Sequence, residues 1–456
     1  MENEPIAPPA PNIDPSPPVH RDFSIFKWLC VIAFFGLLIS LTLFSISKSG
    51  EQKAKNPDVT GNVTQLKIAY LLDAQPGSER DTLKKRLQEA SKDVLEGGIE
   101  GPDEAIVYSF CQNQLEKKID LAKIQVLATS KSETGKKLYR FYQTGTKDPD
   151  LARELISDSK EMGPVGKLVE FSARQRLNQP KVATTVWPMS GLYLYVVFAL
   201  GAFGLLMSGV LAWIIYFVMR SKGLQPEGHP MPELTQGAAS DMGLYAVAMI
   251  AMFFVMSTLG DPLPGNMAIN GAFFGGLFLL GLILILKKKK FQGRSALSWL
   301  NPSTMPISKQ IAWGFAGFCA NLPVMLVLAL LVSPLIKDSN PSHPVQELVQ
   351  QGGFITLFGV FLSASVIAPI WEEIAFRWAL MGGILRATGK PILAVILSAF
   401  AFAAIHPQGP ALWLILGWVG AMSSLLAYHT KSLIPSIVMH ALHNTAILTL
   451  SIVLTS

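Results

Sequence analysis

Long runs of apolar residues, separated by short polar connections, fill most of the chain. The first run, residues 25–46, has roughly the 20 residues that a helix needs to cross a bilayer. Further apolar stretches follow at residues 191–219, 241–259, 267–286, 310–336, 354–385, 391–406, 410–428 and 433–454. The pattern predicts an all-α fold, a polytopic membrane helical bundle of about nine transmembrane helices, in which residues 190–456 form a multi-helix membrane domain.

The N-terminal segment, residues 1–24, is rich in proline and lacks apolar periodicity, so we expect a disordered tail. The apolar run at 25–46 is compatible with a signal peptide or with an uncleaved anchor. It is long, no small-residue cleavage signal follows it, and a polar tail precedes it. These features predict a transmembrane anchor.

Between the anchor and the second apolar stretch, residues 50–187 have the composition of a soluble domain. Apolar residues recur at helical spacing in most of it, and we predict helices at 80–95, 114–127, 148–162 and 164–177, with a strand at 65–72. Residues 51–181 contain no histidine and no glycine-rich phosphate loop. We therefore expect a mainly helical domain that binds or positions a partner protein rather than one that performs chemistry.

Composition supports a membrane protein and excludes several other classes. Half of the 456 residues are apolar and 15% are charged, against about 25% charged residues in ordinary soluble domains. The net charge of +6 is small and clustered, so we expect no nucleic-acid partner. Three cysteines lie far apart, which excludes a disulfide framework and a CxxC metal site.

Basic residues in the short loops predict the orientation in the membrane. The loop after Leu286 contains Lys287–Lys290, whereas the connection at 260–266 contains no basic residue. Counting helices outward from this cytoplasmic loop places the N-terminus in the cytoplasm. The 50–187 domain and the C-terminus are then extracytoplasmic. We expect a multi-pass protein of a bacterial cytoplasmic membrane.

Ionisable residues inside apolar helices are costly and usually functional, and the first group of them is Glu372, Glu373 and Arg377. On a helix, Glu373 and Arg377 are four residues apart and can form an ion pair. Glu372 is turned about 100° from Glu373, so it is free to face another group. The alternative is a helix end whose charges are solvated at the membrane surface.

Two further polar positions occur in the later helices. His406 ends one apolar stretch, and His440 and Asn444 share one face of the last helix, with His443 close beside them. A carboxylate and an imidazole can deprotonate a water molecule, and a histidine and an asparagine can donate hydrogen bonds to an oxyanion. Taken singly, these residues also fit an interfacial histidine and polar contacts between helices.

Three short motifs in this region resemble those of the CPBP family, the CAAX-processing and bacteriocin-processing membrane endopeptidases also called the ABI family. The motifs EExxxR, FxxxH and HxxxN/D correspond here to Glu372, Glu373, Arg377, Phe402, His406, His440 and Asn444. The resemblance covers about residues 240–456 and implies an all-helical intramembrane protease of the glutamate type. It also implies that Glu373 and Arg377 are supporting residues.

The same resemblance implies the catalytic roles. Glu372 and His406 correspond to the pair that activates water, and His440 and Asn444 correspond to the oxyanion donors. The implied reaction is hydrolysis of peptide bonds in membrane-associated protein or peptide substrates at the lipid bilayer, without a cofactor or metal.

Two alternatives from other classes remain open at this point. The first is a zinc-dependent membrane protease with Glu372, His406 and His440 as ligands, because these residue types suit zinc. The second is a non-proteolytic membrane scaffold or proton-coupled transporter that uses the same polar residues. No GxSxG or HExxH motif is present, so the sequence does not indicate a serine hydrolase or a zincin.

Overall fold

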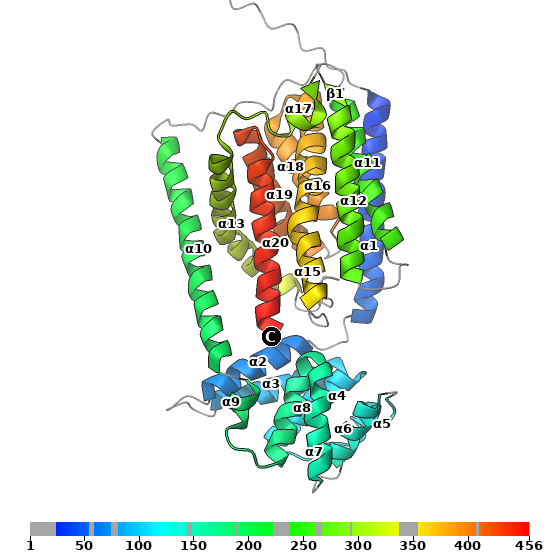
Figure 1. Ribbon diagram of the computed structural model, residues 1–456, viewed down its shortest axis with the longest axis vertical. Coiled ribbons are helices and arrows are strands. Elements are labelled where there is room, and N and C mark those ends of the chain that lie inside the picture. The colour runs from blue at the N-terminus through cyan, green and yellow to red at the C-terminus, as the bar shows by residue number, and fades with distance from the viewer. Residues whose placement is uncertain are drawn as a thin grey trace, which may run out of the picture.

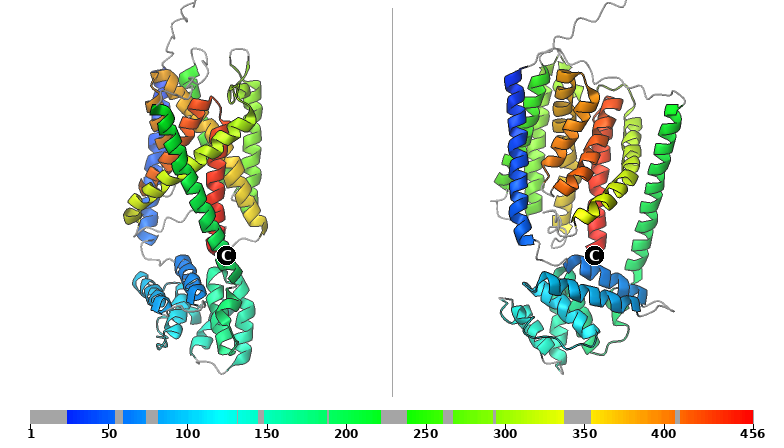
Figure 2. Two further views of the ribbon diagram at one scale, coloured as in Figure 1. Left: turned by 90° about the vertical axis from the view of Figure 1, so that its left-hand side faces the viewer. Right: turned by 180° about the vertical axis from the view of Figure 1, so that it is seen from behind.

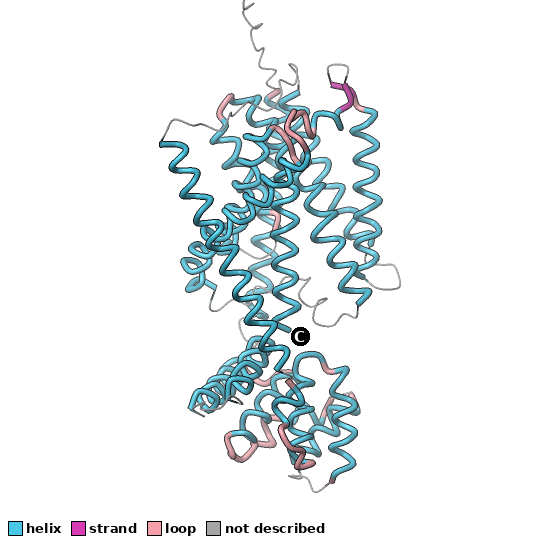
Figure 3. The backbone as a smooth tube through the Cα atoms, turned by 60° about the vertical axis from the view of Figure 1, so that its left-hand side comes forward, coloured by secondary structure: helices cyan, strands magenta, loops and turns pink. Residues whose placement is uncertain are grey.

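The computed structural model describes residues 24–53, 59–73, 81–130, 132–143, 148–187, 189–221, 238–260, 267–291, 294–336, 354–406 and 410–455. The predicted all-α class is confirmed: the tube in Figure 3 is helical almost throughout. Within this described part, strands are confined to a two-residue antiparallel pair, β1 (Lys290–Phe291) and β2 (Arg294–Ser295). Nearly all of the tail predicted to be disordered, residues 1–23, lies outside the described residues.

Each predicted apolar stretch is helical. The helices of the membrane bundle are α1 (Ile25–Lys53), α10 (Met189–Ser221), α11 (Ala238–Gly260), α12 (Met267–Lys288), α13 (Ile307–Ile336), α15 (Phe354–Leu362), α16 (Ala368–Glu373), α17 (Gly382–Thr388), α18 (Pro391–Ala404), α19 (Pro410–Thr430) and α20 (Ile434–Thr455). Among the described residues, five segments are long and apolar enough to cross a membrane, and three more apolar helices are shorter. The count of about nine spans therefore stays a prediction.

One bent helix, residues 354–388, lies in the centre of the bundle. It consists of α15, the π-helical turn η3 (Ser363–Ile367), α16, a second π-helical turn η4 (Ile374–Met381) and α17. Helices α11, α18 and α19 contact η4, while α12 and α20 contact η3. Every residue from Trp371 to Ile384 is buried, so the acidic pair of the sequence lies in the most enclosed part of the bundle.

The first helix is packed into the bundle rather than lying apart from it. In Figures 1 and 2, α1 runs beside α11 along its length. The contact is close because residue 243 is glycine: a Cβ there would lie 3.2 Å from Val31. Lys27 of α1 also forms an ion pair with Asp241 of α11. The anchor is therefore part of the wall around the central helix.

Helix α10 makes a different kind of contact. It crosses α13 where Gly209 meets the backbone of Cys319, and most of its side chains on either side of this crossing are exposed (Figure 2). The Trp213 indole also donates a hydrogen bond to the carbonyl of Ala320, at 2.8 Å.

A second, separate core lies in the segment between α1 and α10, which we call the insert. Its helices are α2 (Val59–Asp73), α3 (Asp81–Gly97), α4 (Pro102–Gln114), α5 (Gln125–Ala128), α6 (Glu133–Gln143), α7 (Pro149–Asp158), α8 (Gly163–Arg176) and α9 (Val182–Val186). Aromatic residues fill the centre, where the Phe171 ring packs on Tyr70, Phe110 and Trp187. The helices predicted at 80–95, 148–162 and 164–177 are present, with Pro164 in a first helical turn.

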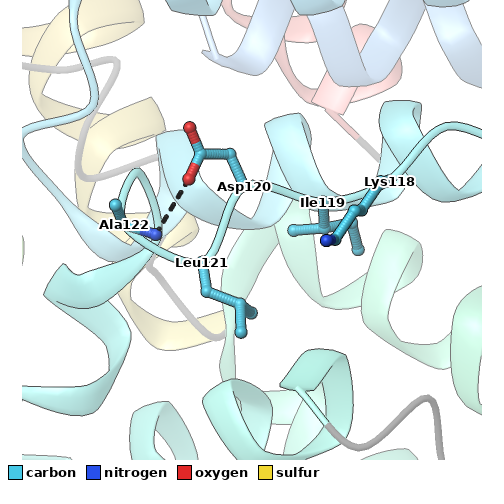
Figure 4. A pocket seen from close by; sticks show the side chains of 5 residues that line it. All are labelled: Lys118, Ile119, Asp120, Leu121 and Ala122. Atoms are coloured by element: carbon cyan, nitrogen blue, oxygen red, sulfur yellow. Dashed lines mark hydrogen bonds between the residues drawn. The ribbon is translucent and has the colours of Figure 1, made fainter.

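Two local predictions in the insert are wrong. Residues 65–72 are helical and belong to α2. Most of their apolar side chains are buried, and a short apolar run of this kind fits a buried helix as well as a strand. The helix predicted at 114–127 is absent, because α4 ends at Gln114 and Glu116 takes a positive φ of 56°. The Asp120 carboxylate then accepts a hydrogen bond from the Ala122 backbone N–H at 3.1 Å, a turn that breaks the helix (Figure 4).

The ends of the bundle differ in what they carry. The insert and the C-terminus lie at one end, whereas the start of α1, β1 and the turn between α17 and α18 lie at the other (Figure 1). In the sequence, Lys287–Lys290 and Lys390 belong to this second end. The arrangement agrees with the helix alternation predicted from the basic loops, and the assignment of the two ends to cytoplasm and exterior stays a prediction.

Candidate active site

The polar side chains singled out in the sequence converge on the central helix from two neighbouring helices. Glu372 and Glu373 end α16, Arg377 lies in η4, His406 follows α18, and His440 lies in α20. The two π-helical turns, η3 and η4, lie on either side of the glutamates in the chain. Turns of this type are rare and frequently occur at functional sites.

The ion pair expected from the sequence spacing is present. Arg377 Nη1 lies 3.1 Å from Glu373 Oε1, and both side chains are fully buried. The guanidinium also donates from Nη2 to the carbonyl of Gly420 in α19, at 3.2 Å, and lies 4.5 Å from the centre of the Phe402 ring. The positive charge is thus held by a carboxylate, a carbonyl and an aromatic face.

His440 connects the two glutamates. Its Nδ1 lies 2.9 Å from Glu373 Oε1, and its Nε2 lies 3.6 Å from Glu372 Oε2. Because a carboxylate paired with Arg377 only accepts hydrogen bonds, Nδ1 carries the hydrogen and donates it to Glu373. In the neutral imidazole, Nε2 then presents a lone pair toward Glu372. Glu373 Oε1 therefore has an ion pair with Arg377 and a hydrogen bond from His440, and Glu372 faces a nitrogen that can exchange a proton.

His406 is half-buried and lies beside the same aromatic ring. Its Nδ1 donates to the Phe402 carbonyl at 2.7 Å, which leaves Nε2 as its second ring nitrogen. The Phe402 ring centre lies 4.8 Å from that of His406 and 5.5 Å from that of His440. The imidazole that faces Glu372 in the structure is that of His440, while Phe402 contacts both histidines. The pairing of Glu372 with His406 stays a prediction.

Asn444 is engaged with the backbone. Its side-chain amide donates to the Ala364 carbonyl in η3 at 2.7 Å. A π-helical turn disturbs the regular pattern of helix hydrogen bonds, and a buried carbonyl left without a donor is costly inside a membrane. A similar contact occurs in the second turn, where Ser398 Oγ donates to the Phe376 carbonyl at 2.8 Å. Both π-helical turns are therefore supported by a side chain from a neighbouring helix.

These contacts were outside the reach of sequence reasoning. No pattern in the sequence marks Ser398 as a support for the central helix, or the Gly420 carbonyl as a partner of Arg377. Phe402 belongs to the FxxxH motif, but its contact with Arg377 and both histidines depends on three helices packing together.

The arrangement can perform acid–base chemistry on a water molecule. One buried carboxylate, Glu372, faces an imidazole nitrogen and has no lysine or arginine ion-pair partner among the described residues. Among the residues that the structure describes, no group of three or more histidine, cysteine, aspartate or glutamate side chains is placed so that it could hold a metal ion.

Comparison with known proteins supports the same region of the chain. Residues 354–446 match the family model described as type II CAAX prenyl endopeptidase Rce1-like. These residues form an Rce1-like domain. The match is consistent with a CPBP family intramembrane protease, and the Rce1-like domain contains every residue proposed for the site. No curated protein and no solved structure matches the chain.

The apolar helices and the match support a multi-pass integral membrane protein with an Rce1-like domain. The matched region begins at α15 and ends within α20, so the insert, α1 and α10–α13 lie outside it.

Proposed function

We propose that the protein is an intramembrane endopeptidase of the glutamate type, which hydrolyses peptide bonds of membrane-associated proteins or peptides with a water molecule activated by Glu372. The observation that carries the proposal is the asymmetry of the two glutamates. Glu373 is neutralised by Arg377, whereas Glu372 faces the imidazole of His440. The Rce1-like match supports membrane endopeptidase activity.

In the proposed reaction, the Glu372 carboxylate takes a proton from water, and the resulting hydroxide attacks the carbonyl carbon of the scissile peptide bond. The C=O π bond opens and its electron pair passes to the oxygen, which becomes an oxyanion. The oxyanion then re-forms the C=O bond as the C–N bond breaks, the C–N electron pair leaves with nitrogen, and the proton that Glu372 took from water passes to the leaving amine. We propose that the Nε2 of His440 carries this proton, since Glu373 holds the ring with Nδ1 protonated and Nε2 directed toward Glu372.

The remaining polar groups can stabilise the oxyanion. Once protonated at Nε2, His440 is also a hydrogen-bond donor, as the family resemblance implies. Asn444 retains one amide hydrogen beyond the one bound to Ala364. His406 has a second ring nitrogen that is not needed for its bond to Phe402, and we propose that this nitrogen helps to orient the attacking water.

The test compares wild-type protein with Glu372→Gln in membranes and identifies new N-termini by mass spectrometry. Gln has the shape of Glu but cannot take a proton, so we expect the cleavage products to disappear. Glu154→Gln is the matched control, because Glu154 is an exposed residue of α7 in the insert. Unchanged cleavage by Glu372→Gln at normal expression would contradict the proposal and favour a scaffold or transporter.

A second arm addresses the metal. We propose that the reaction needs no metal ion, so activity of the purified protein should survive strong chelators. Loss of activity on chelation, with recovery on adding zinc, would support the zinc-dependent alternative. A pair of otherwise identical peptides, one prenylated and one not, then measures whether the lipid is part of the recognised substrate.

A further inference from the structure

A group of lysines lies at the end of the bundle far from the insert. Helix α12 ends in Lys287 and Lys288, which are exposed together with the following Lys289. Exposed Lys309 lies in the first turn of α13, and exposed Lys390 precedes α18. We call Lys287, Lys288, Lys309 and Lys390 the basic end. Figure 1 places the end of α12, beside β1, and the turn between α17 and α18 at this end.

Two backbone hydrogen bonds hold the described residues between α12 and α13 in place, and these residues are close in the chain to three of the lysines. The Ala296 N–H donates to the Lys289 carbonyl at 2.7 Å, and the Leu433 N–H donates to the Leu300 carbonyl at 3.0 Å. Ala296 is fully buried, and Leu300 packs against the same core. The segment lies across the start of α20 and keeps the lysines around it near the end of the bundle.

Hydrophobic side chains continue this surface toward the membrane interior. The first turns of α13 expose Ile307 by 60%, Ile311 by 47% and Trp313 by 44%, close in the chain to Lys309. Lysine stems and a tryptophan ring are suited to the boundary between acyl chains and headgroups. The side chains therefore change from apolar to cationic where the headgroups of a bilayer would begin.

Among the residues that the structure describes, none of the four lysines of the basic end has an acidic partner in an ion pair. Among the described residues of this end, the acidic side chain is Asp241, and it is paired with Lys27. In the insert, several exposed bases have acidic neighbours: Lys85 and Arg86 pair with Glu89, Lys92 with Glu96, Lys136 with Glu133, and Arg153 with Asp150. Among the described residues, the basic end thus carries cationic side chains that have no acidic partner in an ion pair.

We propose that the basic end is a binding surface for the headgroups of anionic phospholipids. Clusters of four to eight basic residues beside a transmembrane helix attract anionic lipids, at roughly 1 kcal/mol per lysine. Lysine ammonium groups donate hydrogen bonds to phosphate oxygens, and the apolar face of α13 accommodates the acyl chains beside them. This surface lies outside the Rce1-like match except for Lys390, so it does not depend on the proposed proteolysis.

The experiment uses the full chain in nanodiscs that contain a mixture of phosphatidylcholine and phosphatidylglycerol. Native mass spectrometry counts the lipids of each kind that stay bound when the protein is released. The test variant is Lys287→Gln/Lys288→Gln/Lys309→Gln. Its matched control removes the same charge from exposed lysines of the insert, as Lys84→Gln/Lys85→Gln/Lys92→Gln.

Wild type and control should retain phosphatidylglycerol preferentially. In the test variant, the ratio of retained phosphatidylglycerol to phosphatidylcholine should fall about fivefold for each replaced lysine that contacts a headgroup. Equal retention of both lipids by wild type would overturn the proposal, as would an equal loss in the control. An unchanged preference in the test variant would also overturn it. Both faces of a nanodisc are accessible, so a change of membrane orientation cannot produce the difference, and circular dichroism verifies folding.

Discussion

The buried pair of Glu373 and Arg377 gives the most direct test of how the site is held together. Both side chains are fully buried; Glu373 Oε1 lies 3.1 Å from Arg377 Nη1 in an ion pair and accepts a hydrogen bond from His440 Nδ1 at 2.9 Å. Replacing Glu373 with Gln leaves the guanidinium buried without a counter-charge. Removing one partner of such a pair costs about 3–5 kcal/mol of stability. Arg377 and His440 both contact Glu373 Oε1, so this estimate already includes the weaker hydrogen bond from His440 to the Gln side chain.

The double variant Glu373→Gln/Arg377→Met should behave differently. It removes both charges and fills the arginine space with an apolar chain, so no unpaired charge remains in the bundle. If the charges were independent, the two single losses would add to about 6–10 kcal/mol. We expect the double variant to lose no more than either single variant, which corresponds to a coupling of about 3–5 kcal/mol.

The free energy of unfolding is measured in mixed micelles by titration with a denaturing detergent, for the wild type, both single variants and the double variant. If each single variant loses less than about 1 kcal/mol of its free energy of unfolding, the ion pair is not shielded from water in the way that the structure shows. Additive losses in the double variant would show that the two charges do not interact. Either result would refute the reasoning.

Three further predictions concern packing, pH and the backbone. Gly209→Ala should lower stability by about 1–3 kcal/mol, because its Cβ would meet the backbone of α13, whereas Gly204→Ala, which faces open space, should be neutral in the same thermal unfolding assay. Burial raises the pKa of the Cys111 thiol to about 12 from its ordinary 9.0. The folded insert therefore keeps a proton that the unfolded chain loses, so its stability should fall by up to about 1.4 kcal/mol per pH unit over this window, a contribution that Cys111→Ala removes in pulse proteolysis. Asn444→Ala should lower stability by about 1–3 kcal/mol, because the Ala364 carbonyl loses its donor; no change in detergent unfolding would limit Asn444 to a role in catalysis.

Periodicity and spacing predicted the parts of the structure that depend on neighbouring residues. Each apolar stretch became a helix, and the four-residue spacing of Glu373 and Arg377 gave an ion pair. The errors in the insert have the same origin, since the apolar run at 65–72 fits a buried helix as well as a strand. The helix expected at 114–127 was interrupted by a turn whose signal, a single aspartate at 120, is weak in sequence.

The site depended on features that local patterns do not contain. The π-helical turns of the central helix follow from packing, and their carbonyls are matched by side chains 80 and 22 residues away along the chain. The contact between His440 and both glutamates likewise joins residues 67 positions apart or more. The family resemblance located the residues, whereas the groups that His440 and His406 contact follow only from the packing of three helices.

The position of Glu372 is difficult to explain by stability alone. A buried carboxylate lowers the stability of a membrane bundle unless it is paired, and an apolar residue of similar size would remove that penalty. Arg377 already offsets Glu373, and its guanidinium is directed to that carboxylate and to the Gly420 carbonyl. Glu372 has an imidazole at 3.6 Å as its partner, which can exchange a proton but does not supply a fixed charge. This placement of Glu372 supports the proposed reaction, in which the carboxylate gains and loses a proton.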